Sequence, residues 1–183
     1  MTNQKSGSWP ARYFMLIVGV SIFALVTDQW TKMWALAHLQ PGEIRPVIGS
    51  FLSLQLVFNP GAAFSFLSHA TWLFTIIAVV VCLVVMLYAP RVRSFAWALG
   101  LGLLLGGAIG NLIDRLTQPP AFGVGHVIDF LNWNGMFVGN VADIWIVLAA
   151  VELFILAMFG VPATVAAKDR RTSRPALKET TSE

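Results

Sequence analysis

The sequence predicts an all-α membrane protein with four transmembrane helices, a small extracytoplasmic β-sheet and a short interfacial helix. Of its 183 residues, 57% are hydrophobic and only 11% are charged, which is too apolar for an ordinary soluble domain. Four apolar runs approach the ~20 residues that a spanning helix needs. They cover residues 13–26, 72–88, 95–113 and 141–159, and the first reaches full depth only by including residues 29–36.

Basic residues are concentrated at one end of the predicted spans. Nine of the twelve Lys and Arg residues precede the first span, lie between the second and third, or follow the fourth. Lys and Arg accumulate in short loops on the cytoplasmic side of a membrane. We therefore expect both termini in the cytoplasm and two long loops outside. Residues 1–162 are expected to form one membrane domain, and the basic residues 163–183 a disordered cytoplasmic tail.

A cleaved signal peptide is the alternative interpretation of the first apolar run, because an Ala-x-Ala-like site follows at residues 35–37. Asp28 and Lys32 lie between the run and that site, where a signal peptide would be uncharged. We therefore favour a span. The single Cys82 lies within the second apolar run, which leaves no intrachain disulfide and no cysteine-based metal site.

The first outer loop is predicted to contain β-structure. Between residues 52 and 58, large apolar residues occupy every second position, which is typical of a strand. Pro46 and Gly49 mark a turn before it, so a small sheet on the membrane surface is expected. The following stretch, Asn59-Pro-Gly-Ala-Ala-Phe64, is either an ordinary surface turn or a place where small residues allow close approach of the backbone.

The third span carries small residues at four-residue spacing, at Gly102, Gly106 and Gly110. Such a stripe lets two helices pack closely in lipid. Homodimerisation is one outcome. The other, which we favour, is internal packing that brings the polar residues Asn111 and Asp114 near another helix.

Carboxylates beside apolar helices are the main candidates for chemistry, since an acidic group there costs about 2.5 to 3.5 kcal/mol. The order of the spans places four on the outer face: Asp28, Asp114, Asp129 and Asp143. Asp28 and Lys32 share one helical face, either as a local ion pair or in support of a site. Glu152, further along the fourth span, is either a proton-relay residue or a group that snorkels or pairs near the inner half. We favour the second interpretation and do not assign Glu152 to the site.

Two neighbouring aspartates do not both ionise easily, so they can share one proton and act as base and acid on a water molecule. This is the arrangement of aspartic proteases. No Ser/His/Asp set competes with it. The three histidines, His38, His69 and His126, lack metal-ligand spacing.

Five motifs occur in order along the chain. They are Asp28-x-x-x-Lys32, Asn59-Pro-Gly-Ala-Ala-Phe64, Gly106-Gly-Ala-Ile-Gly-Asn-Leu-Ile-Asp-Arg115, Val127-Ile-Asp129-Phe130 and Asn140-Val-Ala-Asp143. Together they resemble the lipoprotein signal peptidases, also called signal peptidase II. The resemblance covers about residues 13–160.

The resemblance implies a bacterial inner-membrane aspartic endopeptidase. Its substrates would be diacylglyceryl-modified prolipoproteins in the membrane lipid, cut just before the lipidated cysteine, and globomycin-type cyclic peptides would inhibit it. The catalytic pair would be Asp129 and Asp143. Substrate-binding residues would be Asn59, Asn111, Arg115 and Asn140, and supporting residues Asp28, Lys32 and Asp114. We expect an active site at the outer face and a monomer, with no metal, organic cofactor or nucleic acid.

Two features depart from the family pattern. The family usually has Phe before the Asn of the last motif, whereas this chain has Val138-Gly139, and the stretch between Asp129 and Asp143 is a few residues short. The shape of the second outer loop is therefore left open.

Two other functions compete. A proton-coupled carrier or channel subunit would place acidic groups near the midplane of several spans, but here they cluster at one interface. A non-catalytic assembly or lipid-binding protein would use the glycine stripe and pair its aspartates structurally. In that case Asp114→Asn, Asp129→Asn and Asp143→Asn would all act on folding alone.

Overall fold

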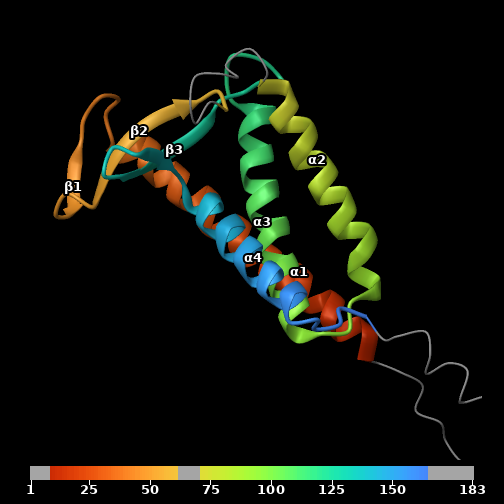
Figure 1. Cartoon of the computed structure of the whole chain (residues 1–183). Coiled ribbons are helices and arrows are strands. Elements are labelled where there is room, and N and C mark those ends of the chain that lie inside the picture. Colours follow the sequence, from red (N-terminus) through yellow and green to blue (C-terminus); the bar gives the residue numbers. More distant parts are fainter. Residues whose placement is uncertain (1–8, 62–70, 165–183) are drawn as a thin grey trace, which may run out of the picture.

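The computed structural model describes residues 9–61 and 71–164. In this part of the chain, four α-helices carry a four-stranded sheet at one end (Figure 1). The elements in order are α1 (Trp9–His38), β1 (Arg45–Ile48), β2 (Leu52–Asn59), α2 (Thr71–Tyr88), the short 3-10 helix η1 (Ala89–Arg91), α3 (Phe95–Thr117), β3 (Val127–Trp133), β4 (Phe137–Gly139) and α4 (Val141–Met158).

All four α-helices are long and apolar enough to cross a membrane, which confirms the prediction of a multi-pass membrane protein. The first is continuous from Trp9 to His38, so the span does include residues 29–36. Helix α2 packs mainly on α3 and exposes apolar side chains such as Leu83 and Leu87, which are 56% and 69% exposed. In a bilayer these side chains face lipid, where apolar exposure carries no cost.

The sheet is antiparallel throughout, in the order β1-β2-β3-β4. The predicted strand at residues 52–58 is confirmed as β2, and the turn before it passes through Gly49, whose φ is +50°. Strands β3 and β4 are absent from the sequence prediction. The first four residues of β3 are all buried, so that strand shows no alternation that could reveal it.

One face of the sheet packs on the end of α1. Leu56 of β2 and Ile128 of β3 form an apolar cluster with Ala35 and Leu39 at that end. Figure 1 shows that α1 and α3 end, and α2 and α4 begin, on the side of the bundle that carries the sheet. The sheet therefore lies at one end of the bundle (Figure 1), where α1 and α3 contact β3.

The glycine stripe of α3 packs inside the molecule. A Cβ atom at Gly106 would lie 2.5 Å from the backbone oxygen of Ser21 and 2.7 Å from the Cβ of Ala24, both on α1. A Cβ atom at Gly102 would lie 2.7 Å from the Cβ of Val20 on the same helix. These contacts favour the internal-packing interpretation of the stripe.

We expect Gly106→Ala to destabilise the protein by about 1–3 kcal/mol, because the new methyl group meets backbone that has no room to move. Thermal unfolding of purified protein in detergent, followed by tryptophan fluorescence, measures the effect. Gly19→Ala on α1 is the matched control, since a Cβ atom there meets nothing within 4 Å. Equal melting temperatures for the two variants would contradict the proposed packing.

Several expectations stay predictions. The predicted short interfacial helix stays a prediction, as does the extracytoplasmic location of the sheet. Of the predicted tail, residues 165–183 lie outside the described residues. So do residues 62–64, the end of the Asn59-Pro-Gly motif.

Candidate active site

The two predicted catalytic aspartates are held by different kinds of element. Asp129 lies on β3 and is paired with Val57 of β2. Asp143 is the third residue of α4, which begins directly after β4. Asn140, between them, caps that helix: its Oδ1 accepts from the backbone N–H of Asp143, and Oδ2 of Asp143 accepts from the backbone N–H of Asn140, both at 3.0 Å. This reciprocal capping box fixes the first turn of α4.

Asn140 also links the two carboxylates. Its Nδ2 donates to Oδ1 of Asp129 at 2.6 Å, while its backbone N–H holds Asp143. Burial, and then the negative charge of Asp143, raise the pKa of Asp129 to about 7. Hydrogen bonds from Asn59 and Asn140 oppose this shift only in part. A pair of this kind holds one proton at neutral pH.

Two further amides complete the surroundings of the pair. Nδ2 of Asn59 donates to Oδ2 of Asp129 at 2.7 Å. Nδ2 of Asn111 donates to Oδ1 of Asp143 at 3.0 Å. Each of the four carboxylate oxygens therefore accepts one N–H group. The structure brings together three of the predicted substrate-binding residues, but it points their amide N–H groups at the aspartates.

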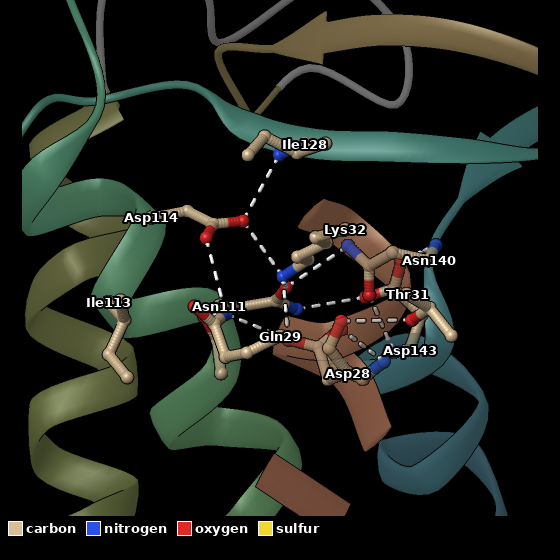
Figure 2. Close-up of polar contacts among 12 residues, drawn as sticks. Asp28, Gln29, Thr31, Lys32, Asn111, Ile113, Asp114, Ile128, Asn140 and Asp143 are labelled. Atoms are coloured by element: carbon tan, nitrogen blue, oxygen red, sulfur yellow. Dashed lines mark hydrogen bonds and ion pairs between the residues drawn. The ribbon is translucent and has the colours of Figure 1, made fainter. Parts of the chain in front are cut away.

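Behind the pair lies a buried ionic network, which Figure 2 shows. Nζ of Lys32 lies 2.8 Å from a carboxylate oxygen of Asp28 and 2.8 Å from one of Asp114. Asp28 also accepts from the backbone N–H of Ala142, and Asp114 from that of Ile128. The network thus joins α1 and α3 to β3 and α4. The predicted Asp28–Lys32 pair is present, and it extends to a third charged group that lies on another helix.

Arg115 lies at the end of α3, with its guanidinium 5.3 Å from the centre of the Phe74 ring. It lines a cleft of about 330 Å³ among α2, α3 and α4, together with Asn59 and Asn111. Asp143 also lines this cleft. The cleft is therefore polar beside Asp143 and apolar elsewhere.

A second cleft, of about 340 Å³, also reaches Asp143. It lies between α4 and the sheet, and its lining includes Phe51, Trp133 and Phe137, whose rings contact one another in sequence. This cleft is almost wholly apolar. Asp143 is consequently reached from two clefts of different polarity.

The chain between Asp129 and Asp143 forms a short hairpin, which answers the question its length raised. Strands β3 and β4 are joined by a tight turn with positive φ at Asn134 and Gly135. A Cβ atom at Gly139 would lie 2.8 Å from Oδ2 of Asp143 and 3.4 Å from the ring of Phe137. Glycine therefore allows the hairpin to approach Asp143 closely. The ring of Phe137 lies next to the same glycine.

Sequence reasoning assigned no role to Gln29, although its amide donates to Asp28 and to the backbone oxygen of Gly110, both at 3.1 Å. Its position next to Asp28 in the first motif is the one feature of the sequence that could have indicated this role.

Within residues 9–61 and 71–164, no group of three or more His, Cys, Asp or Glu side chains is placed to hold a metal ion. The expected absence of cofactors stays a prediction.

Comparison with known proteins decides the family. The model of the family described as signal peptidase (SPase) II matches residues 20–159. This chain belongs to the signal peptidase II family. The family consists of peptidases that process prolipoproteins, so the predicted resemblance is confirmed and the carrier and assembly alternatives lose their support.

Two curated members of the family, both called lipoprotein signal peptidase, are similar over most of this chain. The protein of Rhodococcus jostii is 45% identical over 146 residues, which cover 80% of this chain and 74% of that protein. The protein of Bifidobacterium longum subsp. infantis is 46% identical over 162 residues, covering 88% and 87%.

Solved structures agree on the fold. A bacterial membrane enzyme solved at 1.9 Å is 25% identical with a TM-score of 0.68, covering 80% of this chain and 94% of that one. Another, solved at 2.3 Å, has the same TM-score at 23% identity, covering 88% and 93%, and shows the fold alone.

Proposed function

We propose that this protein is a membrane aspartic endopeptidase that removes signal peptides from diacylglyceryl-modified prolipoproteins and cuts just before the lipidated cysteine. The observation that carries this proposal is the linkage of Asp129 and Asp143 through Asn140 beside two clefts. Membership of the signal peptidase II family supports a peptidase.

In this proposal Asp143 is the base. It lies in the first turn of α4, where the helix dipole favours negative charge, and it accepts two N–H groups. Asp129 is the acid, because its raised pKa lets it keep a proton near neutral pH. Asp143 takes a proton from water as the water oxygen bonds to the scissile carbonyl carbon. Asp129 then protonates the oxygen of the intermediate. As the C–N bond breaks, Asp143 passes the proton it took from water to the leaving amine, and a hydroxyl of the intermediate returns a proton to Asp129.

Arg115 is proposed to hold the peptide backbone. A guanidinium has five N–H donors, and within the described residues only one hydrogen bond from it is seen, to the backbone oxygen of Gly125 at 3.4 Å. The others can donate to peptide carbonyls in the cleft. Asn59, Asn111 and Asn140 then serve mainly to hold the aspartates.

The site is proposed to face the outside of the bacterial inner membrane, with both termini in the cytoplasm. The supporting observation is that Arg91 and Arg93 lie at the α2–α3 turn, at the opposite end of the bundle from the sheet (Figure 1). Basic turns are retained on the cytoplasmic side. A lipid anchor on the substrate cysteine would fix the depth of the scissile bond and raise its effective concentration.

The test is cleavage of a diacylglyceryl-modified prolipoprotein by purified protein in detergent, followed by gel shift. Mass spectrometry should find the lipidated cysteine at the new N-terminus, and globomycin should block the reaction. The same precursor without the lipid is the control and should be cut far more slowly. If well-folded protein leaves the lipidated precursor intact, the proposed function is wrong.

The cleavage rate is expected to fall as the pH rises through about 7. Burial and the charge of Asp143 raise the pKa of Asp129 to about 7, so above that pH the acid has lost its proton. Asn59→Ala should move this alkaline limb to higher pH, since the hydrogen bond from Asn59 stabilises the anion. Initial rates at saturating substrate, from about pH 5 to about pH 9, measure both effects. An alkaline limb that stays in place in Asn59→Ala would contradict the role given to Asp129.

A further inference from the structure

The three amides around the aspartate pair have a definite orientation. An amide presents either its carbonyl oxygen or its NH₂ group to a carboxylate. The NH₂ group stabilises the anion, whereas the carbonyl oxygen requires a proton on the carboxyl group. The group that fixes the orientation of each amide therefore influences which carboxyl of the aspartate pair carries a proton.

Two of these amides are fixed by backbone. Oδ1 of Asn59 accepts from the backbone N–H of Gly61 at 2.8 Å, and Oδ1 of Asn140 accepts from that of Asp143 at 3.0 Å. A backbone N–H can only donate, so the facing atom of each amide must be oxygen. Both NH₂ groups are thereby directed at Asp129.

The third amide, that of Asn111, is held by two side chains, the ammonium of Lys32 and the amide NH₂ group of Asn140. Its Oδ1 lies 3.0 Å from Nζ of Lys32, and its Nδ2 then donates to Asp143 (Figure 2). An ammonium group has three donors and no acceptor. The remaining two donors of Lys32 are taken by Asp28 and Asp114, each at 2.8 Å.

Lys32 does not reach the clefts beside the aspartates. It is 1% exposed and is not among the lining residues of either cleft. Its influence on the reaction is therefore exerted through the groups it contacts and through its positive charge, which opposes the rise in the pKa of Asp129. Of those groups, Asn111 is the one that touches a member of the aspartate pair.

We propose that Lys32 is a positioning residue for hydrolysis, which fixes the Asn111 amide so that its NH₂ group holds Asp143 as the anion. This inference rests on the proposed function. Without the ammonium, the oxygen of Asn111 keeps only its contact with Nδ2 of Asn140 at 3.0 Å. Losing the charged donor weakens the hold on the amide, and when the amide turns, which breaks the remaining bond from Asn140, its oxygen faces Asp143. Asp143 must be protonated in that arrangement and cannot accept a proton from water.

Other charges must be held constant in a test. The charged groups around the pair, in the described part of the chain, are Asp28 and Lys32 on α1, Asp114 and Arg115 on α3, and the aspartates themselves on β3 and α4. Removing Lys32 alone would change the net charge and leave two buried carboxylates unpaired. Lys32→Met combined with Asp28→Asn removes one charge of each sign, so the net charge is unchanged.

The experiment compares pH–rate profiles of wild type, Asp28→Asn and the double variant on a lipidated prolipoprotein in detergent. In the double variant the acid limb should move up by about one pH unit, with kcat reduced about tenfold at the lower pH values and KM unchanged. Asp28→Asn alone keeps the ammonium and loses a negative charge, so its acid limb should stay or move down. Lys32→Arg retains a donor-only cation and should keep the wild-type acid limb.

A double variant whose profile overlays that of wild type would overturn the inference. If the double variant does not fold, Asn111→Leu is the second test, because it keeps the approximate shape and the net charge but offers no N–H to Asp143. An unmoved acid limb in that variant would also overturn the inference. These outcomes differ from failure of the proposed function, in which wild type leaves the lipidated substrate uncut or Asp129→Asn and Asp143→Asn still cut it.

Discussion

Replacing Asp129 or Asp143 with Asn is expected to lower the rate of cleavage of a lipidated prolipoprotein by about 10³-fold or more. General acid and base groups contribute about 10²- to 10⁴-fold each, and residues that act as one unit lose most of the rate when either is removed. Asp143→Asn removes the group that accepts the proton from water. Asp129→Asn removes the proton that the oxygen of the intermediate needs.

These variants must be shown to be folded, because the amide that replaces either carboxylate would place an NH₂ group against N–H donors. Thermal unfolding in detergent should therefore be recorded for each. Glu43→Gln is a suitable control. Glu43 forms an exposed ion pair with Arg45, and it is distant in sequence from Asp129 and Asp143. A folded variant of either aspartate that retains more than about a tenth of the wild-type rate would refute the assigned roles.

Lys32→Met is expected to destabilise the protein by about 3–5 kcal/mol. The side chains of Lys32, Asp28 and Asp114 are 2%, 0% and 3% exposed. Removing the ammonium leaves two carboxylates without their shared counter-ion in a region that water does not reach. Breaking a buried ionic contact from one side costs much more than the net value of the contact.

Thermal or denaturant unfolding in detergent micelles measures this loss. Adding Asp28→Asn to Lys32→Met should recover part of the stability, because one uncompensated charge is then removed. Arg45→Met is the matched control. It also breaks an ion pair, but that pair is exposed to solvent, so little change is expected. If Lys32→Met and Arg45→Met changed stability equally, the buried ionic network would not stabilise the fold more than an exposed ion pair does.

Much of the fold could be predicted because its signals are local. Hydropathy over about 20 residues identifies a membrane span wherever that span packs, and the described part of the chain has four such helices. The alternation at residues 52–58 identified β2. Strand β3 gave no such signal, because its first four residues are all buried and side chains on both of its faces are therefore covered.

The sequence alone identified the candidates for the chemistry, since four aspartates beside apolar helices needed a function or a partner. Their spacing did not determine which two form the pair, and resemblance to a family supplied that choice. The tertiary structure placed Asp114 on Lys32 and linked Asp129 to Asp143 through Asn140. It also showed that the glycine stripe packs on α1 and that the amides point at the aspartates. Hydropathy and periodicity are properties of neighbours in the chain, whereas charge pairing depends on which helix ends and strands meet in space.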